Sequence, residues 1–392
     1  MKQIRSIKEI AITGKKVFLR TDYNVVTDGK ITDPFRIEST LPTIRYLLKH
    51  DCSIVLASHN GRPDGKAAKG LSLEPVAEAL SDLLDKKVTF VHDSVGSAAE
   101  QAAEDLNSRE IILLENLRFH KEEEENGTKF GKALAELADF YVDDAFANIH
   151  RAHASMVGVP KHLPSAAGLL VEREYDTLTK LLTDPKRPFL AIIAGAKVSS
   201  KLEILHSLIE RVDTLVIGGA MANTFLYAEG YNMGKSILEA DLAKQAEEIL
   251  HSARQRGVEI LLPSDLVVAA QPKSGERTRI VKVSDVGEHD MALDLGPDTV
   301  YDIKLAIEQS KMVFWNGTVG YAELPQFAHA SREIACAIAD ARAESIIGGG
   351  DTAGFIDAEG MEKDFDFVST GGGASLELLS GKKMPALDVL LD

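Results

Sequence analysis

Short apolar runs alternate with longer amphipathic stretches along the chain, and this alternation constrains the fold most strongly. Such an order is typical of strands that are each followed by a helix, which favours mostly parallel sheets. In the first half the runs end in charged or polar residues, as in VFLR followed by TDYN; in the second half they end in glycine, as in LAIIAGAK and SIIGGGDT. Ligands of open α/β sheets bind at the carboxyl ends of strands. We therefore expect two different anionic ligands, one for each half, meeting across a shared cleft.

The same pattern divides the chain into two α/β domains. Strands are expected in the first domain at Val17–Arg20, Ile54–Ser58, Thr89–His92, Ile111–Leu114 and Phe140–Asp143. In the second domain they are expected at Phe189–Ala194, Thr214–Ile217, Glu259–Leu262, Met312–Trp315, Ser345–Ile347 and Asp366–Ser369. Between Asp265 and Pro297 the pattern weakens, which predicts short strands and turns that leave the main sheet.

Two helices are predicted from their end signals. One follows Ser72, the expected N-cap, and has Pro75 in its first turn, with apolar residues at helical spacing after it. The other is the amphipathic segment GLLVEREYDTLTKLL, which stops at the two prolines of TDPKRP. The second helix predicts a linker over residues 171–185, between domains at residues 1–170 and 186–378.

Composition argues against several classes of protein. The net charge of −16 disfavours nucleic acid and anionic membranes as partners. No run of eighteen apolar residues and no secretory signal is visible. The two cysteines, Cys52 and Cys336, are expected to pack as small apolar side chains, which fits a reducing cytoplasm. The acidic run KEEEE at residues 121–125 is expected to be a solvated helix start.

Basic side chains follow the strands of the first half, against the overall charge. The ones that stand out are Arg36, His59, Arg62, Arg118 and Arg151. Guanidinium groups match phosphate and carboxylate oxygens, and polar groups that converge on one edge indicate a binding pocket. Any one of these arginines, taken alone, would be read as a surface charge or a helix cap. Together they predict a pocket for a small phosphorylated acid.

Two further pairs of polar residues belong to this half. Asp22 and Asn24 can bind a hydroxyl group of the same ligand. His150 and His153 lack the cysteine or carboxylate companions of a zinc site, so we expect a structural role for them.

The second half carries the features of a nucleotide site. Lys197 and Lys201 stand four residues apart at an expected helix start, where both can face one side and bind a moving phosphoryl group; the alternative is two solvated lysines. GGGDT (348–352) and STGGGAS (369–375) each precede a helix, where backbone N–H groups bind anions. Asp351 can hold Mg²⁺, and Glu323 can accept a hydrogen bond from a ribose hydroxyl.

The familiar nucleotide fingerprints are missing. No G-x-G-x-x-G is present, which counts against a dinucleotide-binding dehydrogenase, and no protein-kinase motif set is found. GYNMGKS (230–236) is one residue short of a P-loop and follows a helical segment, so we reject it.

Nine motifs in order resemble those of phosphoglycerate kinases, and they span nearly the whole chain: RTDYN, DPFRI, SHNGRP, ENLRFH, DDAF…HRAHAS, GAKVSSK, WNGTVGYAE, GGGDT and STGGGASLELL. The resemblance implies two Rossmann-like α/β domains, with residues 379–392 returning to the N-terminal domain. It also implies Mg²⁺-dependent transfer of a phosphoryl group from 1,3-bisphosphoglycerate to ADP, giving 3-phosphoglycerate and ATP, in glycolysis and gluconeogenesis. A cytoplasmic monomer is expected.

The resemblance assigns the glycerate ligand to the N-terminal domain. Asp22 and Asn24 would contact its hydroxyl and carboxylate, and Arg36 would steady the transferring phosphoryl group. The phosphate end would be held by His59, Arg62, Arg118 and Arg151, with Tyr23, Asn60 and Gly61 completing the site.

The resemblance assigns the nucleotide to the C-terminal domain. Lys201 would touch its phosphates, Asp351 would carry Mg²⁺, Glu323 would bind the ribose and Ala292 would lie beside the adenine; Asn316, Gly350, Thr352 and Ala353 complete the site. Direct in-line transfer is expected, with charge neutralised by Arg36, Lys197, Mg²⁺ and the amides of Gly371, Gly372 and Gly373. Because the ligands belong to separate domains, hinge closure at the linker helix is expected.

Several positions depart from the family pattern: Val26, Asn60, Ala194, Ser200, Ala220, Thr318, Tyr321 and Ala322. None removes a charged residue assigned to chemistry, but they can change nucleotide affinity or preference. Two alternatives stay open: a binding protein that has lost turnover, suggested by Thr318 and Ser200, and a different α/β enzyme. A purely structural role does not account for GGGDT and STGGG at strand ends.

Overall fold

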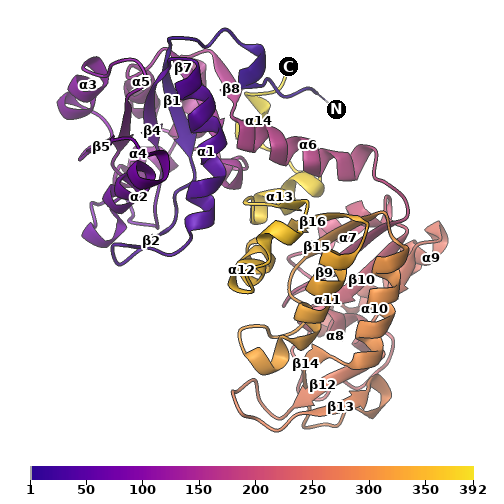
Figure 1. Cartoon of the computed structure of the whole chain (residues 1–392). Helices are drawn as coiled ribbons and strands as arrows, with labels where there is room; N and C mark the ends of the chain where they lie inside the picture. Colours follow the sequence, from indigo (N-terminus) through magenta and orange to yellow (C-terminus); the bar gives the residue numbers. More distant parts are fainter. Residues whose placement is uncertain (1) are drawn as a thin grey trace. The chain divides into compact units, whose positions relative to one another are not determined.

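The computed structural model describes residues 2–392, and the chain forms two compact units. One unit runs to Asp176 and also includes Lys383–Asp392; the other is Thr177–Lys382. Helix α6 (Leu169–Thr183) contains the boundary, at the place where a linker helix is expected. Each unit has its own six-stranded sheet with helices around it (Figure 1). This confirms the predicted fold class.

The first unit is built on a parallel sheet in the order β5-β6-β4-β1-β7-β8. Its strands are β1 (Lys16–Thr21), β4 (Ser53–Ala57), β5 (Val88–Val91), β6 (Ile111–Leu114), β7 (Phe140–Asp144) and β8 (Ser165–Ala167); a small hairpin joins β2 (Val26–Thr27) to β3 (Lys30–Ile31). Its helices are α1 (Pro34–Lys49), α2 (Glu74–Leu84), α3 (Ser97–Glu104), α4 (Lys121–Glu124) and α5 (Thr128–Ala135).

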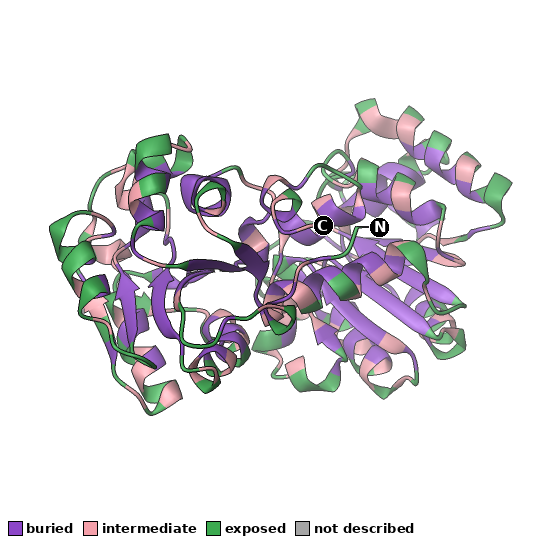
Figure 2. Cartoon of the chain, turned by 90° about the horizontal axis from the view of Figure 1, so that it is seen from above, coloured by how far each residue is buried: buried purple, intermediate pink, exposed green. Residues whose placement is uncertain are grey.

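Alternating residues of these strands form two separate hydrophobic clusters. Val17 and Leu19 pack with α1 and α2, whereas Phe18 between them packs with α3 and α5. Side chains along a strand point alternately to the two faces of a sheet, so the sheet is covered on both sides. Figure 2 shows the strands buried and the outer helix faces exposed.

The C-terminal segment packs against this first unit. Leu391 forms a bridge with Ile4, and the amide of Ala386, in α14 (Pro385–Asp388), donates to the carbonyl of Ile149 at 3.1 Å. Leu387 and Leu390 are buried. The return of the last residues, which the resemblance implied, is therefore confirmed.

The second unit has the parallel order β11-β10-β9-β15-β16-β17. Its strands are β9 (Phe189–Ala194), β10 (Thr214–Gly218), β11 (Glu259–Leu261), β15 (Met312–Asn316), β16 (Glu344–Gly348) and β17 (Phe367–Val368). The strand order reverses between β9 and β15, so the ends of these two strands mark the expected ligand crevice.

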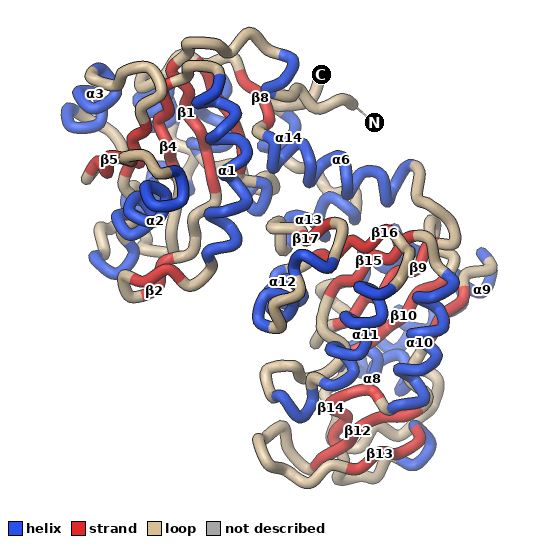
Figure 3. The backbone as a smooth tube through the Cα atoms, in the orientation of Figure 1, coloured by secondary structure: helices blue, strands red, loops and turns tan. Residues whose placement is uncertain are grey.

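Helices and a small sheet complete the second unit (Figure 3). The helices are α7 (Leu202–Ile209), α8 (Gly219–Ala228), α9 (Ala243–Arg256), α10 (Pro297–Gln309), α11 (His329–Asp340), α12 (Gly350–Ala358) and α13 (Gly373–Leu379). An antiparallel sheet of β12 (Asp265–Ala269), β13 (Arg279–Lys282) and β14 (Met291–Leu295) confirms the predicted excursion from the main sheet.

Two local predictions are wrong. Helix α2 has Leu73 as its N-cap rather than Ser72, although the Ser72 hydroxyl accepts a hydrogen bond from the Glu74 amide at 3.2 Å. Cys52 is buried as expected, but Cys336 is exposed on α11, because it lies on the outer face of that amphipathic helix; both thiols are free. Among the helices of residues 2–392, none combines the length and apolarity needed to cross a bilayer.

Candidate active site

Basic side chains gather where the strands of the first sheet end. Arg20 lies near the end of β1, His59 follows β4, Arg118 lies shortly after β6, and Arg151 and His153 follow β7. Burial lowers the pKa of His59 well below its ordinary value, and the charges of Arg20 and Arg118 lower it further. His59 is therefore neutral, so its 3.8 Å approach to Asp22 is no ion pair. The predicted residues His59, Arg118 and Arg151 do come together.

Arg118 is the most unusual of these cations because it is almost fully buried. Its Nη1 donates to the carbonyl oxygen of Gly61 at 2.7 Å. Its Nε lies 3.2 Å from a carboxylate oxygen of Glu124, but without hydrogen-bond geometry, and its Nη2 has no hydrogen-bond partner in the part of the chain that the structure describes. The Nε of Arg151 is also buried, and no residue from 2 to 392 accepts a hydrogen bond from it. Buried donors left unpaired in this way are suited to an anion.

Arg36 is held by two carboxylates at the start of α1. Its Nη1 donates to Asp22 at 2.5 Å, and its Nε donates to Asp33, the N-cap of α1, at 2.9 Å. Asp22 in turn accepts from the Asn24 amide, and the Asn24 side chain accepts from the amide of Gly61 at 2.8 Å. This chain of contacts fixes four of the predicted residues around one loop edge.

Three other predicted residues do not present buried, unpaired donors: the side chains of Tyr23 and Asn60 are hydrogen-bonded within the protein, and that of Arg62 is exposed. The Tyr23 hydroxyl is buried against Thr40, and burial raises its pKa. The Asn60 amide is bonded on both sides to the backbone of Val26, which uses up its oxygen. Arg62 is exposed, and among residues 2–392 it forms no hydrogen bond or ion pair.

The acidic run at residues 121–125 is not fully solvated, which corrects the sequence-based expectation. Glu123 is completely buried and accepts hydrogen bonds from the amide (2.9 Å) and hydroxyl (2.5 Å) of Ser155. It also lies 4.0 Å from Arg20 and 3.9 Å from His153. A run of four glutamates shows no periodicity, so nothing in the sequence distinguished this one.

His153 is held neutral inside this network. Burial lowers its pKa to about 3, with further contributions from the charges of Arg20, Arg118 and Arg151. Within residues 2–392 no three histidine, cysteine, aspartate or glutamate side chains cluster as a metal site. The structural role expected for His150 and His153 stays a prediction.

In the second unit, glycines allow the chain to approach itself closely at the switch point. Gly317 follows β15 with φ +94°, and a side chain there would collide with the carbonyl of Ala194 at the end of β9. The Gly317 amide donates to the hydroxyl of Thr352 at 2.5 Å, which ties this turn to the first turn of α12.

Lys201 and Asn316 form a polar pair beside these glycines. The Lys201 ammonium donates to the Asn316 amide oxygen, whereas the Asn316 Nδ2 is buried without a partner among residues 2–392. Burial lowers the pKa of Lys201 to about 8, against the attraction of Asp351, which raises it. The pair offers two nitrogen donors to an anion.

The expected helical pairing of the two lysines is wrong. Helix α7 begins only at Leu202, with Lys201 at its N-cap, so Lys197 precedes the helix in a turn and is exposed. Of the two lysine side chains, that of Lys201 is the one that forms a hydrogen bond within the unit, to Asn316. The residues between the two lysines are valine and two serines, which favour a turn over an early helix start.

The glycine turn at residues 371–373 is partly used by its own contacts. The Gly371 amide donates to the hydroxyl of Ser369 at 3.0 Å, and that hydroxyl pairs with Ser375 at 2.7 Å. Gly372 has φ +52°, and α13 starts at Gly373. The amide of Gly371 is therefore committed in this structure.

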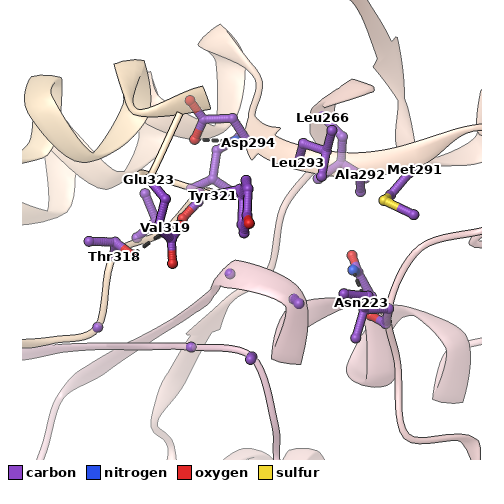
Figure 4. A pocket seen from close by; sticks show the side chains of 18 of the residues that line it. Asn223, Leu266, Met291, Ala292, Leu293, Asp294, Thr318, Val319, Tyr321 and Glu323 are labelled. Carbon is purple, nitrogen blue, oxygen red and sulfur yellow. Dashed lines mark hydrogen bonds between the residues drawn. The ribbon is translucent and has the colours of Figure 1, made fainter. Parts of the chain in front are cut away.

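A cavity of about 210 Å³ opens at the switch point of the second sheet (Figure 4). Its walls are mostly apolar, as is usual for small-molecule sites. Predicted residues Ala292, Glu323 and Asp351 line it; lining residues that sequence reasoning missed include Asn223, Leu266, Met291, Leu293 and Asp294. Gly350, Thr352 and Ala353 follow at the N-terminus of α12.

Asp294 is a buried carboxylate in this wall. It accepts hydrogen bonds from the amides of Leu295 and Ala330, and burial raises its pKa to about 7. A side chain at Gly320 would collide with it, so this aspartate fixes the shape of the turn after β15.

Comparison with known proteins agrees with this geometry. Residues 7–382 match the family model "Phosphoglycerate kinase". The chain is similar to phosphoglycerate kinases of Moorella thermoacetica (47% identical, 99% of each chain) and Pelotomaculum thermopropionicum (45%, 99% of each). It is also similar to the solved structures of phosphoglycerate kinase from Coxiella burnetii (37% identical, TM-score 0.89, 99% of each chain) and Pyrococcus horikoshii (31%, TM-score 0.87, 99% and 98%). The chain belongs to the phosphoglycerate kinase family.

Proposed function

We propose that this protein reversibly transfers a phosphoryl group from 1,3-bisphosphoglycerate to ADP, forming 3-phosphoglycerate and ATP, as a glycolytic kinase. Family membership over nearly the whole chain supports the reaction. The single observation in the molecule that supports it best is the buried Arg118 guanidinium with unpaired N–H groups at a strand-end edge. Buried N–H donors that lack a hydrogen bond are costly unless a ligand accepts from them.

The first unit would bind the glycerate. The unpaired donors of Arg118 and Arg151 would hold the phosphate end, and Arg62, which is exposed, can join them. Asp22 and Asn24 would bind the hydroxyl and carboxylate. Tyr23, His59, Asn60 and Gly61 would shape the loops that carry these groups.

The second unit would bind the nucleotide. Its phosphates would lie against Lys201, Asn316 and the amides at the start of α12, and the base in the apolar cavity. Glu323 lines the same cavity and would accept from the ribose. Lys197, exposed and ahead of α7, can reach a bound phosphoryl group.

A magnesium ion fits the groups present. Asp351 is exposed at the cavity, and Mg²⁺ is usually held by one or two carboxylates together with substrate phosphates. When bound, the ion would supply charge neutralisation for the phosphate oxygens. The chain would present the Asp351 carboxylate to the ion beside Lys201, whose positive charge would also neutralise the phosphate oxygens.

The transfer step needs alignment rather than covalent help from the protein. A terminal oxygen of ADP would attack the acyl phosphorus in line; the bond from phosphorus to the carboxyl oxygen breaks, and 3-phosphoglycerate leaves as a carboxylate. Arg36, Lys197 and the amides of Gly372 and Gly373 would neutralise the equatorial oxygens, with Gly371 once its own contact is released. No phosphoenzyme and no net proton transfer are required.

Because the two ligands would belong to separate units, closure around α6 would bring them together. Small-angle scattering should show a smaller radius of gyration with 3-phosphoglycerate and Mg–nucleotide together than with either alone. An unchanged radius would argue against closure.

A monomer in a reducing cytoplasm is part of the proposal. The two free cysteines support such a compartment, because neither is used in a disulfide. Sedimentation at micromolar concentration would test the monomer.

A coupled assay tests the function. With 3-phosphoglycerate, ATP and Mg²⁺, formation of the acyl phosphate should oxidise NADH in the presence of glyceraldehyde-3-phosphate dehydrogenase, and omission of Mg²⁺ should abolish it. Binding of both ligands without turnover would favour a binding protein that has lost activity. Failure to bind either ligand would refute the assignment.

A further inference from the structure

One polar side chain interrupts the apolar end of the nucleotide cavity. Asn223, on α8, is buried at 2% exposure and lines the cavity. Its Nδ2 donates to the carbonyl oxygen of Ile237 at 3.0 Å. Its Oδ1 has no hydrogen-bond partner among the described residues 2–392, and Figure 4 shows it on the side of Ala292 and Met291.

The orientation of this amide follows from its contact with Ile237. If the amide were flipped, Oδ1 would face the Ile237 carbonyl oxygen, and two acceptors would oppose each other. The group that Asn223 presents to the cavity is therefore an acceptor. Because the surrounding wall is apolar, water compensates this acceptor poorly, and a donor from a ligand is favoured.

The opposite side of the cavity carries an aromatic ring. Tyr321 stands across from Asn223 and Met291 in Figure 4, and it is the one aromatic residue among those that line the cavity. Its backbone amide donates to the carbonyl of Leu293 at 2.8 Å, which anchors the residue beside β14. An aromatic face binds any nucleobase by stacking, with little preference among bases.

The cavity also has a direction. Gly195, Gly317 and Asp351 lie at its strand-end side, where the phosphates of the proposed nucleotide belong. Asn223, Met291 and Ala292 line another side, which is left for the base.

We infer that Asn223 is a specificity-determining residue that selects a 6-aminopurine over a 6-oxopurine, by accepting a hydrogen bond from the exocyclic amino group. This inference rests on the proposed function. An amino group donates to the Asn223 oxygen, whereas a 6-oxo group would place one acceptor against another. Tyr321 supplies the stacking that both bases share. The selection is thus separable from general affinity.

The test compares ADP with IDP, which differ in whether the 6-position carries an amino or an oxo group. For the unmodified chain, kcat/KM with 1,3-bisphosphoglycerate should favour ADP by about tenfold, the scale of one neutral hydrogen bond. In Asn223→Leu, which keeps the branched shape and the number of side-chain heavy atoms but removes the acceptor, this preference should disappear through a loss with ADP. An equal ratio in the two proteins would overturn the inference.

Two further variants separate selection from structure. Tyr321→Leu should weaken the binding of ADP and IDP equally and leave the ratio of their kcat/KM values unchanged. Loosening of the loop at Ile237 would also affect both nucleotides equally. A change in the ratio of kcat/KM for ADP to that for IDP therefore reports the loss of the Asn223 acceptor. If Asn223→Leu fails to fold, Asn223→Ala serves with the same expected ratio, and KM for the glycerate ligand is the control for an intact first unit.

Failure of the proposed function would be distinguishable from failure of this inference. If no nucleotide supports turnover, the function fails, and calorimetric Kd values for ADP and IDP still report the base preference. Turnover with equal use of both nucleotides would refute the role of Asn223 alone.

Discussion

The carboxylate of Glu123 accepts hydrogen bonds from both the amide and the hydroxyl of Ser155. These bonds anchor the loop that follows Arg151 and His153. The Ser155 hydroxyl also accepts from Arg20 at 2.8 Å. The fully buried Glu123 therefore lies next to the buried and half-buried basic side chains at the strand ends of the first sheet. Its charge partly compensates cations that the proposed anionic ligand would otherwise have to balance alone.

Replacing this acid should destabilise the protein. Glu123→Gln keeps the size but removes the charge from both Ser155 hydrogen bonds, so we expect a loss of about 2 kcal/mol in the free energy of unfolding. Glu125→Gln, at an exposed position of the same acidic run, is the matched control and should be neutral. Urea unfolding measures both, and equal midpoints for the two variants would contradict the burial of Glu123.

The neutral state of His153 makes stability depend on pH. Its pKa is about 3 when folded, against an ordinary value near 6.5, so between these values only the unfolded chain binds the proton. Acidification from pH 6.5 should therefore destabilise the folded state through this residue, by up to about 1.4 kcal/mol per pH unit.

His153→Asn isolates this effect. Burial raises the pKa of Asp143 to about 6 and of Asp144 to about 7, and these groups stabilise the folded state as pH falls. Because both are present in either protein, the difference between the two stability profiles reports His153. The profiles should diverge below pH 6.5, and parallel profiles would rule the explanation out.

Lys201 should take up a proton when nucleotide binds at alkaline pH. Its pKa of about 8 leaves it partly neutral at pH 8.5, and bound phosphates would restore the charge. Calorimetric heats of Mg–ADP binding should then vary with the ionisation enthalpy of the buffer. Lys201→Met should bind more weakly and lose this variation; buffer-independent heats for the unmodified chain would place Lys201 away from the phosphates.

The stability of the unliganded protein should respond to the same group. The pKa of Lys201 is lower when folded, so the unfolded chain binds more protons between about pH 8 and 10.5, and stability attributable to this residue rises across that window. Below pH 8 the Lys201 side chain is charged in the folded state, so its burial lowers the free energy of unfolding by the full amount. Lys201→Met should therefore raise the unfolding midpoint at pH 7 and flatten the rise above pH 8.

Arg36 and Arg62 should differ in which kinetic constant they affect. Arg36 is held by Asp22 and Asp33, which suits a fixed role in the transition state, so Arg36→Ala should lower kcat far more than it raises KM for 3-phosphoglycerate. Arg62 is exposed, and Arg62→Ala should act mainly on KM. A pure KM effect of Arg36→Ala would make it a binding residue only.

The sequence predicted the parts of the molecule that depend on local patterns. β6 and β9 coincide with their predicted bounds, because each is a continuous apolar run bounded by polar or glycine residues. β8 was missed, because Ser165–Ala167 is only three small residues long and is a strand through its pairing with β7.

The sequence singled out candidate site residues shortly after strands, because strand ends can be read from sequence. His59 and Arg118 are examples, since they lie shortly after β4 and β6; Asn316, the last residue of β15, was named only through the family resemblance. Glu123 and Asn223 were missed because their importance comes from partners 32 and 14 residues away, which no local pattern shows. The lysine pair failed for a different reason: the helix start was placed too early, so Lys197 and Lys201 do not share one side of a helix.

The central claim is that the two units bind different ligands, and calorimetric titration tests it most directly. Arg118→Met should lose binding of 3-phosphoglycerate while Mg–ADP still binds with the affinity of the unmodified chain, and Lys201→Met should show the converse. A variant in either unit that weakened both ligands to the same extent, with its fold intact, would contradict the account.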